Sequence, residues 1–150
     1  MGKYNVLDIA KYFFDSGLFL SNKKLQKLVF YAYAWYLVKN NDNSNNIQNK
    51  LFNSRFEAWV HGPVCPELYY AYNDNRIRDY VAKPIEDCDV KNVLKIVLNV
   101  YGKYSGEELE NFTHREEPWK KARNGCSVFE RCTNTIKDID IYEYYSKQIV

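Results

Sequence analysis

Several features that would point to a particular class of protein are missing from this chain of 150 residues. Its six glycines are scattered singly, so there is no glycine-rich loop to hold a phosphate. Its four cysteines form no C-x-x-C pair, which gives a structural zinc site no support. No stretch has the apolar length of a signal peptide or of a membrane span. We therefore expect a cytosolic protein without a cofactor, whose cysteines stay reduced.

An excess of charge of one sign is also missing. The chain has 21 basic and 19 acidic side chains, a net charge of only +2. Apart from the pairs Lys23-Lys24 and Lys120-Lys121, the basic residues are dispersed. This balance gives no support to binding of a nucleic-acid backbone, which requires a basic face. A nucleic-acid-binding regulator is kept as an alternative, although the charge of the chain gives it no support.

Aromatic residues are abundant instead. Fourteen tyrosines, eight phenylalanines and three tryptophans contribute much of the 46% hydrophobic content. A chain of this length forms one domain and buries a core without disulfides. The tyrosines predict a bulky core in which many hydroxyl groups need a polar partner. We expect a single domain over residues 1–150.

Apolar residues at helical spacing predict a mainly α (α+β) fold with six to seven helices and a small β-element near residues 52–61. Asn5 and Ser21 are expected to cap the first two helices, and Ser105 with Glu108 forms a capping box for another. The expected helices cover residues 5–19, 21–39, 67–78, 90–104 and 105–114, a short turn opened by Pro118, and a C-terminal helix capped by Asp140 that contains Ile141, Tyr144, Tyr145 and Ile149.

The second helix is the strongest of these predictions. Its apolar stripe is expected to face the core, and its three lysines are expected to stay solvated. The stripe consists of Leu25, Leu28, Val29, Ala32 and Tyr36, and the lysines are Lys23, Lys24 and Lys27. The asparagine-rich residues 40–49 that follow predict a mobile loop or a fraying helix end.

A tight corner follows the predicted strand. Phe56, Ala58 and Val60 alternate with polar or large residues, Gly62-Pro63 is expected to stop the strand, and Pro66 suits the first turn of a helix. Four side chains that could form a site or a packed hinge are gathered around this corner: Trp59, His61, Glu67 and Tyr69.

Histidine is scarce, with only His61 and His114 in the chain. A histidine- or metal-dependent hydrolase would use both, together with Glu67 and Glu117 as acid or base. Cys65 could join the histidines at a metal, but Pro63 interrupts a regular helical spacing. Because nothing arranges these groups into a triad, the hydrolase is kept as an alternative to a binding protein.

Three phrases occur together in a characteristic order. They are SNKKLQKLVFY from Ser21, FEAWVHGPVCPELY from Phe56 and FTHREEPWKKAR from Phe112. In order and spacing they resemble the SocA-like antitoxin family, or Panacea domain, which includes phage- and mobile-element-associated proteins. The matching motif positions are Leu25, Gln26, Lys27, Leu28, Trp59, Gly62, Pro63, Pro66, Tyr69, Thr113, His114, Glu117, Pro118 and Trp119. The chain departs from the family at His61, where an aromatic or polar residue is common.

The resemblance implies an antitoxin that binds a cognate protein toxin directly and has no catalytic residues. In one branch of the family it also implies an adaptor that delivers the toxin to a AAA+ protease. The motifs either form the partner surface or only maintain the domain, for example by stacking of the turns that hold Trp59 and Trp119. Exposed tyrosines would be the contact residues in the second case, and Tyr70, Tyr72, Tyr142 and Tyr145 are the candidates.

Overall fold

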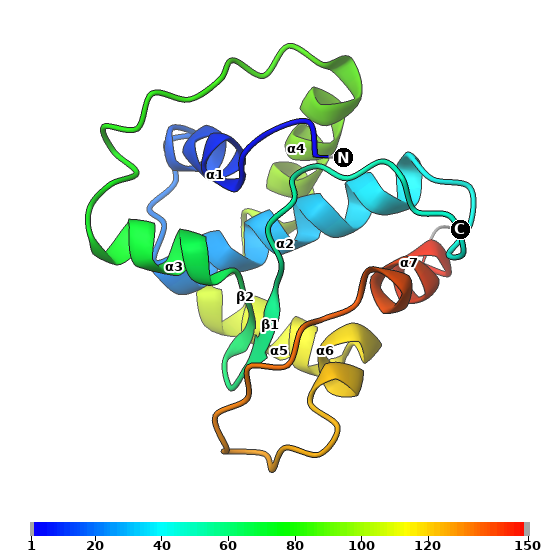
Figure 1. Ribbon diagram of the computed structural model, residues 1–150. Coiled ribbons are helices and arrows are strands. Elements are labelled where there is room, and N and C mark those ends of the chain that lie inside the picture. The colour runs from blue at the N-terminus through cyan, green and yellow to red at the C-terminus, as the bar shows by residue number, and fades with distance from the viewer. Residues whose placement is uncertain (1, 149–150) are drawn as a thin grey trace.

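The computed structural model describes residues 2–148, which form seven helices and one two-stranded sheet arranged around a central helix, α2 (Figure 1). The elements are α1 (Val6–Phe14), α2 (Asn22–Lys39), β1 (Glu57–Trp59), β2 (Gly62–Val64), α3 (Pro66–Asn73), α4 (Cys88–Tyr101), α5 (Gly106–Arg115), α6 (Glu117–Ala122) and α7 (Asp138–Ser146). The predicted mainly α fold with a small β-element is confirmed.

Helix α2 packs against most of the other elements. It contacts α1, α3, α4, α5, α7 and β2, so it is buried on nearly all sides. Ser21 caps it as predicted, its Oγ accepting a hydrogen bond of 3.1 Å from the Lys24 amide. The predicted apolar stripe is buried, but the prediction that Lys27 stays solvated is wrong, because this side chain is only 1% exposed. The β1–β2 hairpin and α5 cover the face of α2 that the sequence pattern predicts to be exposed to water.

Two further predicted caps are confirmed. Ser105 with Glu108 forms the predicted capping box, and the predicted cap Asn5 forms a capping box with Asp8. The predicted Asp140 cap is wrong: α7 begins at Asp138 with Lys137 in the N-cap position, and the Ile141 amide donates to the Lys137 carbonyl. Ile149 lies outside the described residues.

The Gly62-Pro63 step does not end the β-structure as expected, because it begins a second strand. Strands β1 and β2 pair antiparallel, and Pro63 lies opposite Ala58. Both backbone groups of Ala58 point away from β2: its N–H donates to Asn134 and its carbonyl accepts from Arg123. The missing N–H of Pro63 therefore removes no bond from the ladder.

The residues 40–49 form a loop, as predicted, which is crossed by side-chain hydrogen bonds. The Asn41 side chain bonds the backbone at both ends of the loop, accepting from the amides of Gln48 and Asn49 and donating to the carbonyls of Leu37 and Asn49. These bonds satisfy backbone groups that have no partner in a helix or a sheet, because the loop is irregular.

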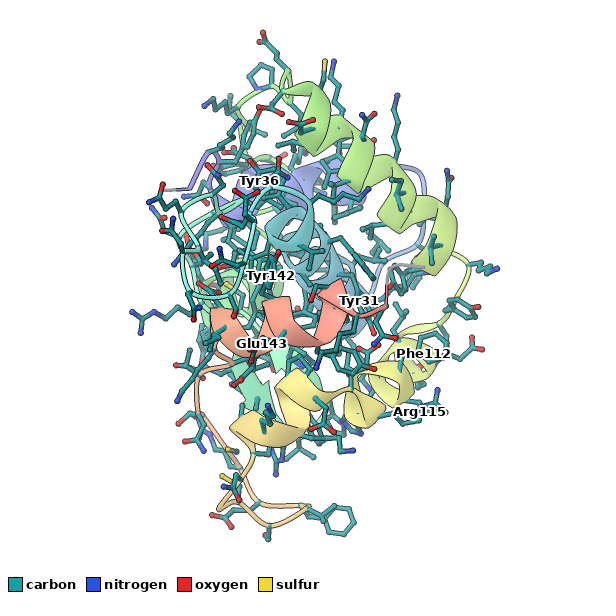
Figure 2. The ribbon with its side chains drawn as sticks, turned by 90° about the vertical axis from the view of Figure 1, so that its right-hand side faces the viewer. Tyr31, Tyr36, Phe112, Arg115, Tyr142 and Glu143 are labelled. Carbon is teal, nitrogen blue, oxygen red and sulfur yellow. The ribbon has the colours of Figure 1, made fainter. Side chains whose placement is uncertain are left out.

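The core is rich in aromatic pairs, as the composition predicts. Tyr31 on α2 lies toward α7 (Figure 2), and its ring stacks on Tyr101 with a centroid distance of 4.0 Å. The hydroxyls of Tyr31 and Tyr145 both donate to Glu116, at 2.8 and 2.7 Å. One carboxylate thus joins α2 and α7 to the start of α6.

Within residues 2–148, no helix combines the length and the apolar character needed to cross a membrane.

Candidate binding groove

An open cavity of about 590 Å³ lies between α2, the hairpin, the start of α3 and residues 129–132. We call it the α2–hairpin groove. Its lining includes five of the motif and corner residues, Gln26, Lys27, Trp59, His61 and Tyr69, and the candidate contact residue Tyr70. The corner is therefore both a packed junction and the wall of a cavity.

Gln26 holds the corner to α2. Its buried side chain forms a two-way amide pair with the backbone of Cys65, accepting from the N–H at 2.9 Å and donating to the carbonyl at 3.3 Å. This pair fixes the residue from which α3 starts. Burial raises the pKa of the Cys65 thiol to about 11, which keeps it protonated at neutral pH. Cys65 is thus poorly suited to act as a nucleophile or a metal ligand.

Lys27 lies at the floor of the groove. Its Nζ donates to the Pro63 carbonyl at 3.3 Å. Burial lowers the pKa of Lys27 to about 7, against the opposing effect of Glu110. The charge of this ammonium group therefore changes close to neutral pH.

Gly62 is required where the lysine stem crosses the hairpin. Its φ is +111°, in the region that side chains disfavour, and a Cβ would lie 2.6 Å from Cε of Lys27 and 2.9 Å from Oγ1 of Thr113. The glycine in the second motif thus makes room for the lysine in the first motif.

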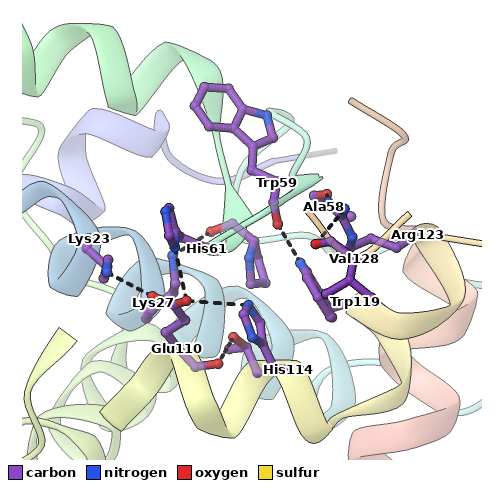
Figure 3. Close-up of polar contacts among 12 residues, drawn as sticks. Lys23, Lys27, Ala58, Trp59, His61, Glu110, His114, Trp119, Arg123 and Val128 are labelled. Atoms are coloured by element: carbon purple, nitrogen blue, oxygen red, sulfur yellow. Dashed lines mark hydrogen bonds and ion pairs between the residues drawn. The ribbon is translucent and has the colours of Figure 1, made fainter. Parts of the chain in front are cut away.

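Glu110 connects the two histidine turns (Figure 3). Its carboxylate contacts Nδ1 of His61 at 3.0 Å and Nζ of Lys23 at 2.8 Å, and it lies 3.8 Å from Nε2 of His114. Partial burial raises the pKa of Glu110, but hydrogen bonds from Lys23 and His61 outweigh it and hold the pKa below its usual value. Burial lowers the pKa of His114, so its ring favours the neutral form.

The carboxylates expected beside the histidines lie elsewhere. Glu67 accepts a hydrogen bond from Ser54 at 2.7 Å, and Glu117 is exposed and pairs with Lys120 at 3.6 Å. Among residues 2–148, no three or more histidine, cysteine or acidic side chains are grouped closely enough to hold a metal ion. The residue that meets both histidines, Glu110, was not predicted.

The third motif contacts the corner by a hydrogen bond. Nε1 of Trp119 donates to the Trp59 carbonyl at 2.8 Å, while its ring stacks on His114 at 4.1 Å. The Trp59 ring packs on Tyr69 at 5.0 Å. The two turns are adjacent as expected, but each tryptophan has another ring as its neighbour.

The remaining motif residues support this arrangement from within. Thr113 donates to the Glu110 carbonyl at 2.9 Å, Pro118 is buried in the first turn of α6 and Pro66 opens α3. Leu25 and Leu28 belong to the core. These positions maintain the domain and do not reach the groove.

The candidate tyrosines differ in exposure. Tyr145 is 1% exposed, so its prediction as a surface contact is wrong. Tyr72 and Tyr142 are half-buried and donate to the carbonyls of Leu20 and Asn41. Tyr70 is 52% exposed and lines the groove.

Arg123 is a functional candidate whose role the sequence did not reveal. It is 6% exposed, and its guanidinium donates to the carbonyls of Ala58, Ser127 and Glu130 at 2.9, 2.7 and 2.7 Å. It therefore fixes the segment 127–130, which projects beyond the hairpin in Figure 1. We call residues 127–131 the tip. The sequence around Arg123 does not indicate that this side chain is buried. Its hydrogen-bond acceptors are backbone carbonyls, which every residue has, so no particular side chain marks them.

Fold and groove together define a helical domain with an open cavity built largely from its own motif residues. The model of the family "Antitoxin SocA-like, Panacea domain" matches residues 25–120, so the chain belongs to the SocA-like antitoxin family. The chain is also 27% identical over 140 residues to Antitoxin SocA of Caulobacter vibrioides, covering 79% of this chain and 71% of that protein. No solved structure matches it.

Proposed function

We propose that this protein is an antitoxin that neutralises a partner protein toxin by direct binding. The observation that carries the proposal is the family match over residues 25–120, which includes the matching positions of all three motifs, and residues of the first two motifs line the groove. Binding requires a preformed surface rather than catalytic groups, and buried motif side chains hold the corner and the tip in place.

Occlusion is the mode of action that a rigid surface supports. A folded face that covers the toxin's active surface needs only a few aromatic or charged anchor residues to bind tightly. The family resemblance also suggests delivery of the toxin to a AAA+ protease. Measuring the amount of toxin in the cell distinguishes delivery from occlusion. Occlusion leaves the amount of toxin in the cell unchanged, whereas delivery lowers it.

Co-expression with the products of neighbouring genes tests the proposal. We expect one neighbour to stop growth when expressed alone, and growth to return, with a co-purifying complex, when this chain is present. Val29→Asp is the control, because a carboxylate at this fully buried position of α2 prevents folding and should abolish rescue. Absence of a toxic neighbour, or toxicity without rescue, contradicts the proposal.

The contact of His61 and His114 with Glu110 favours a histidine-dependent hydrolase as a second candidate. Hydrolysis of p-nitrophenyl acetate and p-nitrophenyl phosphate by the purified chain tests this candidate. A rate above the buffer rate that is lost in His61→Ala supports an enzyme, and equal rates of chain and variant exclude this use of the histidine.

A further inference from the structure

The α2–hairpin groove differs in charge from the rest of the molecule. Its lining includes the basic residues Lys23, Lys27, His61 and Arg131, and none of the described residues that line it is acidic, although Glu110 pairs with Lys23 and His61 from α5. The whole chain carries a net charge of only +2, so this concentration of positive charge is local. A surface of this kind attracts a group of negative charge.

One of these basic side chains is free to bind a ligand. Lys27 is only 1% exposed, and its Nζ donates to the Pro63 carbonyl. The exposed side chain of Arg131, in contrast, has no ion pair or hydrogen bond within residues 2–148. A carboxylate in the groove could therefore accept hydrogen bonds from the guanidinium group of Arg131.

The rim of the groove is aromatic. Tyr70 and Phe129 are 52% and 89% exposed, and Val128 beside Phe129 is 72% exposed. The tip that presents these apolar side chains is held by the buried guanidinium of Arg123. A buried arginine that orders an exposed apolar tip is consistent with a surface prepared for a partner.

We propose that the α2–hairpin groove binds an acidic segment of the toxin, with an Asp or Glu side chain at Arg131 and a neighbouring apolar side chain against Tyr70 and Phe129. This inference rests on the proposed antitoxin function and adds the binding surface and the chemistry of the partner. A cavity of about 590 Å³ has room for a few side chains of such a segment.

An acidic peptide fits this groove better than a nucleic acid. A nucleic-acid backbone requires positive charge along an extended path. In the groove, Glu110 pairs with Lys23 and His61, which leaves Arg131 as the exposed basic side chain without an ion pair within residues 2–148.

The first test does not need the toxin. A library of random twelve-residue peptides displayed on phage is panned against the purified chain. We expect enriched peptides to combine Asp or Glu with Phe, Tyr, Trp or Leu, and their affinity to fall at least tenfold in Arg131→Glu and in Phe129→Ser. The matched controls are Lys95→Glu on α4 and Phe19→Ser, which exchange an exposed lysine and a 94% exposed phenylalanine outside the groove.

Enrichment of basic peptides, of no common pattern, or of peptides that bind all four variants equally overturns the proposal. Displacement of the peptides by an equal concentration of a twenty-nucleotide oligothymidylate also overturns it in favour of nucleic acid.

The second test uses the toxin identified by growth rescue. Arg131→Glu and Phe129→Ser should lose rescue and weaken the complex at least tenfold, while Lys95→Glu and Phe19→Ser should behave as the unmodified chain. Full rescue by both groove variants overturns the groove assignment and leaves the antitoxin function intact. A specific acidic peptide without any toxic neighbour supports the groove and contradicts the antitoxin function.

Discussion

The ammonium group of Lys27 lies in a space that the packing of α2 against the hairpin almost closes to water. Four charged or titratable groups surround it from three elements: Lys23 on α2, His61 on the hairpin, and Glu110 and His114 on α5. Because burial lowers its pKa from 10.5 to about 7, the charged form is less stable in the folded chain than in the unfolded chain. The cost is present below pH 7 and disappears as the pH rises toward 10.5.

Replacement of Lys27 by Met should therefore stabilise the fold. We expect Lys27→Met to raise the free energy of unfolding by about 1–4 kcal/mol at pH 6, since a buried charge is exchanged for an apolar group of similar length. The gain should shrink toward pH 10, because the lysine is then neutral in the fold and most of the cost of burying its charge has disappeared. Urea denaturation of both proteins at pH 6, 8 and 10 measures this difference, and a gain that grows with pH contradicts the assignment.

Glu116 provides a second prediction at the residue scale. Burial raises the pKa of Glu116, while hydrogen bonds from Tyr145 and Tyr31 oppose the shift. Because the raised pKa disfavours the carboxylate in the fold, Glu116→Gln should become more stable relative to the unmodified chain as the pH rises from 4 to 8. The amide oxygen of Gln can still accept from both hydroxyls.

Glu116→Ala is the matched comparison, because it leaves both tyrosine hydroxyls without their acceptor. We expect a loss of about 2–4 kcal/mol in the free energy of unfolding. Thermal or urea unfolding of the two variants separates the roles of charge and hydrogen bonding. Equal stability of the Ala and Gln variants would show that the shared acceptor contributes nothing.

At the scale of elements, Arg123 joins α6, the hairpin and the tip. We expect Arg123→Met to lower the free energy of unfolding by about 2–4 kcal/mol, because it leaves the buried Ala58 carbonyl and two partly buried carbonyls of the tip without this donor. Amide hydrogen exchange should accelerate most in residues 127–130. The control is Lys121→Met on the same helix, whose side chain is 54% exposed; if both variants exchange alike, Arg123 does not hold the tip.

Three helix starts were predictable because a local side chain marks each of them. Asn5, Ser21 and Ser105 lie next to the amides that they cap, so a few neighbouring residues contain the whole signal. The start of α7 was missed because no side chain caps it. The return strand was missed because Gly-Pro is typical of turns, and its place in a ladder depends on which way the backbone of Ala58 points.

The site was predictable only in part, and for the same reason. The motifs identified Gln26, Lys27, Trp59 and Tyr69, which lie together in space. Glu110 and the tip were missed because their roles depend on contacts between segments far apart in the chain, such as Glu110 with Lys23. Lys27 was placed in water because helical spacing describes one helix and not the elements that cover it.

At the scale of the whole molecule, α2 connects the parts. It contacts five other helices and β2, so most of the core includes at least one of its side chains. We expect a single cooperative transition on heating, with coincident loss of far-ultraviolet circular dichroism and tryptophan fluorescence. The slowest amide exchange should occur in α2. Two separated transitions would show that the hairpin with α5 and α6 unfolds independently of α1 and α4.

The hydrogen bonds from Arg123 to the tip, which we call the Arg123 clamp, affect how the surface of the tip can change during evolution. In the tip, the arginine bonds only to main-chain carbonyl oxygens, and every amino acid supplies one of these. Mutations at Val128, Phe129 and Arg131 therefore leave the clamp in place, much as loops vary on a constant antibody framework. One scaffold can thus acquire new recognition surfaces by drift at a few codons, without first losing its stability.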